Sequence, residues 1–143
     1  MSIILPVSKE EQQAVLQHLQ TASLPVEDIS ENVLLYVLKD GRTIIGTIGM
    51  EHDGNTALLR SLSVEHSKRQ SGYGEQLVTF LERAAKEKGI CAIYLLTTTA
   101  ASFFERRGYV VINRSEAPAF IGQTSEFASI CPSSATLMKK EIV

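Results

Sequence analysis

The sequence of 143 residues has little of what marks several specialised classes of protein. Its two cysteines, Cys91 and Cys131, are too few for a disulfide framework or a self-sufficient zinc site. No apolar run approaches the roughly 20 residues that a membrane-spanning helix needs, and residues 1–11 lack the pattern of a signal peptide. We therefore expect a soluble, cytoplasmic protein with two reduced thiols and no bound metal.

An excess of charge of either sign is also missing. The 14 lysines and arginines and the 16 aspartates and glutamates are interleaved along the chain, and the formal net charge is −2. A protein that binds a nucleic-acid backbone normally carries a basic surface, so nucleic acid is not an expected partner. The 44% hydrophobic content and the absence of repeats or linkers predict one compact domain over residues 1–143.

The pattern of apolar residues alternates between strands and helices. It predicts strands over residues 3–5, 33–38, 43–50, 57–64, 91–96, 109–112 and 135–139. It predicts helices after residue 8 and over residues 74–88, 100–107 and 118–128. Ser8 and Glu11 have the spacing of a capping box, and Asp40-Gly41 is typical of a tight hairpin turn.

The order of these elements indicates the fold class. Antiparallel strands come first, and a later helix then connects one strand to the next, which implies a right-handed crossover and parallel pairing. We therefore predict an α/β fold with a mixed central sheet, antiparallel in its N-terminal part and parallel at its centre, with helices on both faces.

The most informative segment lies between the strand at 57–64 and the helix at 74–88. It reads Arg69, Gln70, Ser71, Gly72, Tyr73, Gly74. Glycines at the start of a helix remove side chains from the approach path, so backbone N–H groups and the positive end of the helix dipole can meet an anion. This segment, which we call the phosphate loop, is therefore expected to bind phosphate.

Two other phosphate-binding motifs fit this loop poorly. A Walker A loop requires lysine and then serine or threonine after its last glycine, where this chain has Glu75 and Gln76. A dinucleotide fingerprint requires a small residue at position 77, where this chain has Leu77, and an early parallel strand before the loop. The loop instead matches the pattern Arg/Gln-x-x-Gly-x-Gly/Ala, with Leu62-Ser63-Val64 ahead of it.

Together with the later segment Phe103-Phe104-Glu105-Arg106-Arg107-Gly108-Tyr109, this loop resembles the GNAT superfamily of acetyl-CoA-dependent N-acetyltransferases over nearly the whole chain. The stretches at 94–99, 103–109 and 126–135 are similar to small acetyltransferases encoded beside bacterial arsenic-resistance genes. They are more distantly similar to the acetyltransferase domain of N-acetylglutamate synthases. The resemblance implies a small amino acid, rather than a protein tail, as the acetyl acceptor.

The resemblance also implies how acetyl-CoA is held. The backbone of Leu62 and Val64 would pair with the pantetheine arm, and the phosphate loop would hold the pyrophosphate. The Val64 N–H would donate to the thioester carbonyl, where negative charge develops. The cofactor-binding residues expected in this way are Leu62, Ser63, Val64, Arg69, Gln70, Ser71, Gly72, Tyr73, Gly74, Phe103 and Phe104.

Arg60 is a candidate for binding the acceptor. Strict alternation along the strand places Leu58, Arg60, Leu62 and Val64 on one face. If that face looks into the cleft, the arginine fork suits a carboxylate, phosphonate or arsinate on an amino-acid-like acceptor. The alternative is that Arg60 is a partner in a surface or subunit salt bridge. Glu51 and Thr97 are assigned to the acceptor together with Arg60.

The residues for proton transfer are less well defined. The family's usual glutamate and tyrosine align with Leu58 and Phe104, and neither of these can move a proton. Water can suffice as a relay for an α-amino group with a reference pKa near 8. The replacement candidates are Cys131, Thr97 and Thr98, together with Glu51 and His52 at a hairpin end. His18 and His66 are interpreted as ordinary helix-surface and loop residues.

These observations predict an acetyl-CoA-dependent N-acetyltransferase that acts on the amine of a small, acidic amino acid or a toxic analogue of one. The main alternative is a noncatalytic acyl-CoA-binding or regulatory domain, because the usual glutamate and tyrosine are absent. N-acetylation of proteins is a weaker alternative, because no acidic patch for docking a basic tail is visible. The apolar tail at 137–143 is compatible with a homodimer.

Overall fold

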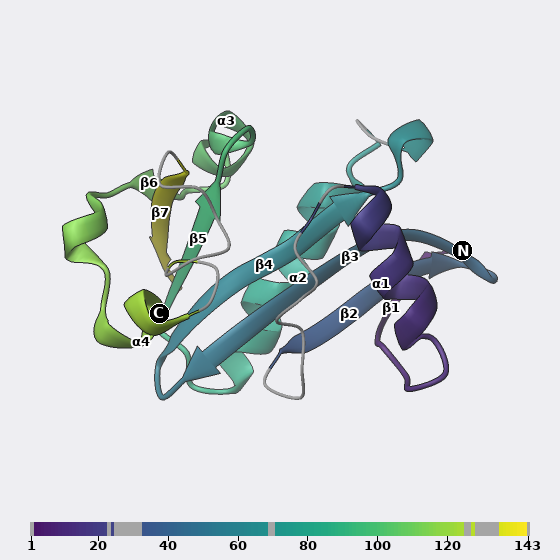
Figure 1. Ribbon diagram of the computed structural model, residues 1–143, viewed down its shortest axis with the longest axis horizontal. Coiled ribbons are helices and arrows are strands. Elements are labelled where there is room, and N and C mark those ends of the chain that lie inside the picture. The colour runs from purple at the N-terminus through teal and green to yellow at the C-terminus, as the bar shows by residue number, and fades with distance from the viewer. Residues whose placement is uncertain are drawn as a thin grey trace. The chain divides into compact units, whose positions relative to one another are not determined.

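The computed structural model describes residues 2–22, 24, 33–68, 71–124, 127 and 135–142. The elements, in chain order, are β1 (Ser2–Pro6), α1 (Gln12–Thr21), β2 (Leu34–Asp40), β3 (Thr43–Asp53), β4 (Thr56–Val64), η1 (His66–Lys68), α2 (Tyr73–Glu87), β5 (Ala92–Thr97), α3 (Ala101–Glu105), β6 (Val110–Val111), η2 (Arg114–Glu116), α4 (Ala119–Gln123) and β7 (Thr136–Glu141) (Figure 1). This order confirms the predicted α/β class.

One sheet of seven strands runs in the order β1-β2-β3-β4-β5-β7-β6. β1, β2 and β3 pair antiparallel, and β4 pairs parallel with β5 from Thr56 to Leu58. β7 pairs antiparallel with both β5 and β6. The predicted mixed sheet is confirmed, and the insertion of the last strand between β5 and β6 is a feature that the sequence pattern did not indicate.

The chain divides into two compact units, which are described separately. Unit 1 comprises residues 1–51 and 60–83, and unit 2 comprises residues 52–59 and 84–143. The boundary between them falls within β4 and within α2.

In unit 1, Ser8 and Glu11 contact each other in the turn before α1, but Ser8 does not cap the helix as predicted, because its N-cap residue is Glu11 and no side chain caps it. The Glu11 N–H donates to Ser8 Oγ at 3.3 Å, and the Ser8 hydroxyl donates to Glu11 Oε1 at 3.1 Å. The α-helix itself begins at Gln12, and its buried side chains, Val15 and Leu19, pack on Val37 of β2. The apolar stripe therefore fixes α1 on the sheet.

Helices α1 and α2 cover opposite faces of the sheet in unit 1. Val37 packs against α1, whereas the ring of its neighbour Tyr36 meets Phe80 of α2 edge to face at 5.1 Å between centroids. Consecutive residues of a strand point to opposite faces, so the two helices lie on opposite sides of β2. Figure 1 shows α1 in front of these strands and α2 behind them. The prediction of helices on both faces is confirmed.

The hairpin between β2 and β3 turns at the predicted Asp40-Gly41. Asp40 pairs with Thr43, and Gly41 has φ +63°, a left-handed conformation that glycine adopts without a steric penalty. The register shifts between Leu38 and Lys39, where β3 accommodates an extra residue.

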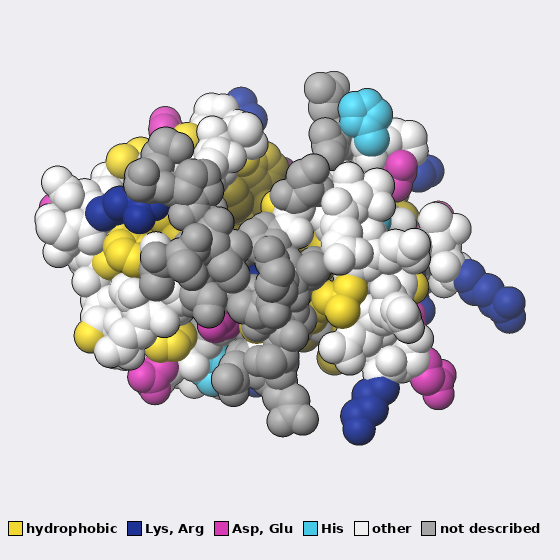
Figure 2. Space-filling model, viewed as in Figure 1, with side chains coloured by type: hydrophobic (Ala, Val, Ile, Leu, Met, Phe, Trp, Pro, Cys, Tyr) yellow, Lys and Arg dark blue, Asp and Glu magenta, His cyan; other side chains and the backbone are white. Residues whose placement is uncertain are grey.

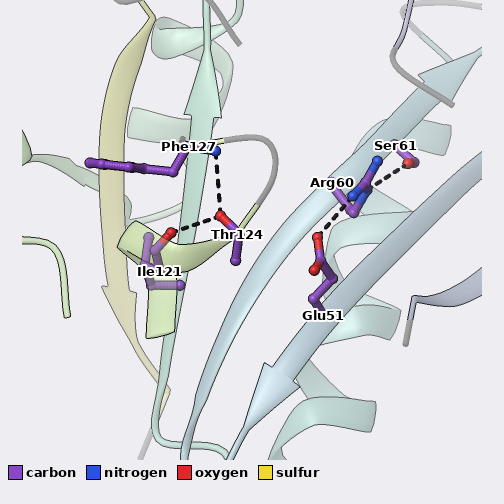
Figure 3. Close-up of polar contacts among 6 residues, drawn as sticks. All are labelled: Glu51, Arg60, Ser61, Ile121, Thr124 and Phe127. Carbon is purple, nitrogen blue, oxygen red and sulfur yellow. Dashed lines mark hydrogen bonds and ion pairs between the residues drawn. The ribbon is translucent and has the colours of Figure 1, made fainter. Parts of the chain in front are cut away.

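In unit 2, the first residues of β4 pack with β5 and β7. Leu58, Tyr94, Ile121 and Leu137 form a buried cluster. Helix α4 and strand β6 are shorter than the predicted ranges 118–128 and 109–112, because α4 ends at Gln123 and β6 covers Val110–Val111. The Thr124 hydroxyl donates to the Ile121 carbonyl at 2.7 Å and accepts the Phe127 N–H at 3.4 Å (Figure 3). These bonds close the end of α4.

The surface carries charges of both signs. On the face shown in Figure 2, neither basic nor acidic side chains form an extended patch among the residues drawn in colour. Within the described ranges, no helix combines the length and the apolar character needed to cross a membrane.

Gly46 of β3 tests the packing in unit 1. A Cβ on Gly46 would lie 2.6 Å from the Ser63 carbonyl oxygen and 3.0 Å from Leu77 Cδ1. Backbone cannot yield as a flexible side chain does, so we expect Gly46→Ala to lower the free energy of unfolding by about 1–3 kcal/mol in urea denaturation.

The matched control for this change is Gly122→Ala in α4. A Cβ there meets no atom within 4 Å, and alanine favours the helix over glycine. This variant should match or exceed the parent's stability. Equal stability of Gly46→Ala and the parent would show that β3 does not approach β4 and α2 this closely.

Candidate functional site

The described part of the phosphate loop leads directly into α2. Gly72 has φ +85°, a left-handed conformation, and its carbonyl accepts the Gln76 N–H at 3.0 Å to close the first turn. Ser71 and Gly72 are exposed, and Tyr73 and Gly74 are half-buried. Arg69 and Gln70 lie outside the described residues. The start of a 15-residue helix therefore faces solvent with its positive dipole end.

Buried apolar side chains fix the position of this helix start. Leu77 and Leu81 are fully buried, one and two turns into α2. Leu77 also lies against the Gly46 position of β3. The amide groups at the start of α2 are therefore held by the core rather than by the loop alone.

The backbone of β4 changes conformation at Ser61. Ser61 has φ +59° and is the one non-glycine with positive φ among the described residues. A non-glycine residue in this region is strained and persists where its surroundings hold it. The Thr47 hydroxyl of β3 donates a buried 2.8 Å hydrogen bond to the Ser61 carbonyl. The strain at Ser61 is therefore held by a neighbouring strand.

This conformation breaks the alternation of side chains along β4. Thr47 of β3 pairs with Val37, which packs against α1, so Thr47 and Glu51 lie on the face of β3 that bears α1. Arg60 reaches Glu51 and therefore lies on this same face. Ser63 also reaches the α1 side, where its hydroxyl lies 3.2 Å from His18 Nε2. Residues 60 and 63 share a face only if the alternation shifts by one residue between them.

The expectation that Arg60, Leu62 and Val64 share one face is therefore wrong. Leu62 and Val64 alternate with Ser63, so their side chains lie on the face opposite to Ser63. The physical reason is the left-handed backbone at Ser61, which is not signalled by a glycine in the sequence.

Arg60 forms a buried ion pair within unit 1. Its Nη1 donates to Glu51 Oε2 at 2.8 Å, and its Nε donates to Ser61 Oγ at 3.4 Å (Figure 3). The Arg60 side chain is fully buried, and that of Glu51 is 16% exposed. Arg60 is thus in a salt bridge, but a buried one within the chain rather than the surface or subunit salt bridge given as the alternative. Opposite charges stand side by side, with the carboxylate nearer to solvent.

His18 has a more specific environment than its helix-surface pattern indicated. The side chain is half-buried, and its Nε2 meets the hydroxyl of Ser63, a residue that is 7% exposed. Burial lowers the pKa of the His18 imidazole, and the Glu65 carboxylate opposes part of that shift. The imidazole is therefore neutral at pH 7 and able to accept a proton.

In unit 2, Thr97 and Thr98 follow the predicted position at the end of β5. The Thr97 hydroxyl accepts the Ala100 N–H at 2.9 Å, and the side chain is half-buried. Thr98 is exposed. Thr97 thus helps to begin α3, while its hydroxyl proton remains available to a second acceptor.

Two aromatic residues of α3 and one residue just after it form a group of edge-to-face rings. Phe104 is 4% exposed, and its ring meets those of Phe103 and Tyr109 edge to face. The Arg107 guanidinium lies 3.7 Å from the centre of the half-buried Phe103 ring. Phe104 is a core side chain here, and Phe103 is the more accessible of the two.

Leu58, Cys131 and His52 are the remaining candidate residues. Leu58 is fully buried in the apolar cluster of unit 2, at the position aligned with the family's usual glutamate. Cys131 lies outside the described residues, and His52 is exposed at the end of β3. Among the side chains that the structure describes, no group of three or more His, Cys, Asp or Glu is placed to hold a metal ion.

Comparison with known proteins agrees with this architecture. The profile of the acetyltransferase (GNAT) domain matches residues 31–111, more than half of the chain. A protein of Bacillus subtilis (strain 168) that is named as an acetyltransferase is 39% identical to this chain over 66 residues. Those residues are 46% of this chain and 45% of the relative, so the match spans about half of the relative's length.

Solved structures share the fold at low sequence identity. An acetyltransferase of the GNAT family from Staphylococcus aureus Mu50 superposes over 100% of both chains, with a TM-score of 0.78 and 17% identity. N-acetylglutamate synthase from Neisseria gonorrhoeae, in complex with coenzyme A and L-arginine, has a TM-score of 0.81 and 14% identity. That match covers 98% of this chain and 33% of the synthase chain.

The hydrogen bond from Thr47 can be tested by substitution. Thr47→Val removes the hydroxyl and leaves the buried Ser61 carbonyl without this donor. We expect a loss of about 1–3 kcal/mol in the free energy of unfolding, measured by urea denaturation. Thr47→Ser keeps the hydroxyl and serves as the control, with a smaller loss. A Thr47→Val protein as stable as Thr47→Ser would contradict the role given to this bond.

Proposed function

The chain belongs to the acetyltransferase (GNAT) domain family, and from this membership we propose that it transfers the acetyl group of acetyl-CoA to the amine of a small acceptor. We propose residues 1–143 as one acetyltransferase domain that works in the cytoplasm. The observation that carries the proposal is the family match, which includes β4, the phosphate loop and α2.

Two features of unit 1 support binding of acetyl-CoA. The start of α2 presents backbone N–H groups and a positive dipole end, which suit a pyrophosphate. The break at Ser61 changes the course of β4 just before Leu62 and Val64, whose backbone groups would pair with the extended pantetheine arm. We assign Ser63, Arg69, Gln70, Ser71, Gly72, Tyr73 and Gly74 to the same site, with Phe103 and Phe104 as the aromatic contacts.

The same arrangement suggests how the reaction is promoted. If the pantetheine arm follows β4, the Val64 N–H is positioned to donate to the thioester oxygen as negative charge develops there. Holding the amine against the carbonyl carbon then supplies much of the rate enhancement. Placement of the two substrates is thus the main contribution that we assign to the backbone of β4.

For the acceptor we propose a small amino acid with an acidic group, or a toxic analogue of one. Arg60 and Glu51 form a pair of opposite charges, and a free amino acid carries the complementary pair. The guanidinium matches a carboxylate, and the partly exposed Glu51 matches an ammonium group. Thr97 is a further candidate contact. We also propose that this protein is related to the acetyltransferases encoded beside arsenic-resistance genes.

A second candidate is a noncatalytic domain that binds acyl-CoA. Leu58 and Phe104 stand where many family members have their glutamate and tyrosine, and both are buried without a group that can transfer a proton. A binding domain would hold acetyl-CoA without releasing the thiol. A homodimer is also proposed, because Ile3 and Leu5 on edge strand β1 are 52% and 41% exposed.

Release of free CoA thiol tests the proposed activity. The purified protein is incubated with acetyl-CoA and a panel of amines: glutamate, glutamate analogues with phosphinate or arsinate ends, arginine, polyamines and a histone-like peptide. We expect thiol release with the acidic amino acids and none with the peptide. Tight binding of acetyl-CoA, with no thiol release for any amine, would favour the noncatalytic domain.

Arg60 is tested through the acceptor's Michaelis constant. Arg60→Lys keeps a positive charge but loses the planar fork, so we expect the KM for an acidic acceptor to rise roughly tenfold. The KM for acetyl-CoA should stay the same. The double variant Arg60→Gln with Glu51→Gln leaves no uncompensated buried charge and controls for stability. An unchanged acceptor KM in both proteins would remove Arg60 from the acceptor site.

A further inference from the structure

We infer that His18, acting through the hydroxyl of Ser63, accepts the proton that the acceptor's ammonium group must lose before it attacks acetyl-CoA. The inference rests on the proposed acetyl transfer and supplies a proton acceptor that the positions of Leu58 and Phe104 do not provide. It is carried by three residues that α1, β4 and the segment after β4 bring together in unit 1: His18, Ser63 and Glu65.

The imidazole of His18 contacts the hydroxyl of Ser63. His18 Nε2 and Ser63 Oγ are 3.2 Å apart, within hydrogen-bond distance. The neutral imidazole can take the Ser63 hydroxyl proton, and the same oxygen can accept a proton from a nearby ammonium group. A serine and a histidine in this relation form a two-member proton relay.

A nearby negative charge acts on the imidazole of His18. Among the described residues, Glu65 is the charged group whose field raises the pKa of His18, against the lowering effect of burial. Hydrogen bonds from the Ser67 hydroxyl and N–H lower the pKa of Glu65 itself, and His66 and His18 also favour its charged form. Glu65 is therefore a fixed negative charge that stabilises the imidazolium once it forms.

Ser63 adjoins residues of the proposed cofactor site. Ser63 stands between Leu62 and Val64, whose backbone groups we assign to the pantetheine arm and the thioester oxygen. The left-handed backbone at Ser61 turns the Ser63 side chain toward α1. The relay is thus one residue away from the N–H proposed to hold the developing negative charge.

The chemistry balances without any other reactant. The ammonium group gives one proton to Ser63 Oγ as the hydroxyl gives its own proton to His18 Nε2. The neutral nitrogen forms a bond to the carbonyl carbon, and the carbon–sulfur bond then breaks with its electron pair on sulfur. The second proton leaves the nitrogen and ends on the CoA thiolate, and His18 returns its proton to solvent.

The pH dependence of kcat/KM for the acceptor tests this inference. The assay measures thiol release between pH 5 and 10, with L-glutamate or with the panel amine that gives the most release. In the parent protein the acidic limb should fall at an apparent pKa below about 6.5, because it reports a histidine whose pKa is lowered. His18→Gln should move that limb toward the pKa of the amine, near 8 or above.

The size of the effect depends on pH. At pH 7 we expect His18→Gln and Ser63→Ala each to lower kcat/KM roughly 100-fold, the lower end for a proton-transfer group. The loss should shrink toward pH 10, where a growing fraction of the free amine is already neutral. His66→Gln is the matched control, because His66 is exposed and also acts on Glu65. Its profile should follow that of the parent protein.

Two further readouts separate this role from a structural one. His18→Gln should keep the parent's affinity for CoA in calorimetry, and both variants should unfold in urea near the parent's midpoint. If the His18→Gln variant fails to fold, the His18→Asn variant replaces it. Thiol release by His18→Gln with the parent's pH profile would overturn this inference alone. No thiol release by the parent protein with any amine would overturn the proposed function, and this inference with it.

Discussion

The left-handed backbone at Ser61 is the constraint on which the rest of the site depends. A regular strand would place Arg60 and Ser63 on opposite faces, and the two residues would meet different helices. With φ +59° at Ser61, both turn toward the side that carries α1. The Thr47 hydroxyl holds this conformation from the neighbouring strand. One unfavourable residue therefore brings Arg60 to Glu51 and Ser63 to His18.

Most of the fold could be predicted from local patterns. The hairpin at Asp40-Gly41 and the glycine-containing start of α2 each depend on a few neighbouring residues, and both are present, whereas Ser8 contacts Glu11 without capping α1. The place of β7 between β5 and β6 could not be predicted, because it depends on long-range pairing. Neither α4 nor β6 reaches its predicted length, because the boundaries of helices and strands are the least reliable part of predictions from sequence patterns.

The site was predictable only in part, for a related reason. The amide groups at the start of α2 follow from the glycine pattern, whereas the bend in β4 occurs at a serine that carries no such signal. His18 has the spacing of an exposed helix residue, and its partner is 45 residues further along the chain. A sequence signal for this pair would have required knowing which face of β4 Ser63 occupies. That face is set by Ser61.

In this account, backbone and side chains have different tasks. We propose that amide groups of β4 and α2 hold acetyl-CoA, that the Arg60–Glu51 pair selects the acceptor, and that the His18–Ser63 relay removes a proton. All of these groups lie in unit 1 and are fixed by the packing of α1 and α2 on the two faces of the sheet. The division explains how an acetyltransferase of this family could work with Leu58 and Phe104 at its usual proton-transfer positions.

Amide hydrogen exchange with and without CoA tests the central claim, that β4 after Ser61 and the start of α2 form the cofactor site. We expect slower exchange on CoA binding at Leu62, Val64 and residues 71–75. The amides of α1 and β1 should change little, and they provide an internal reference. Protection confined to other segments, with residues 62–64 and 71–75 unchanged, would contradict the account.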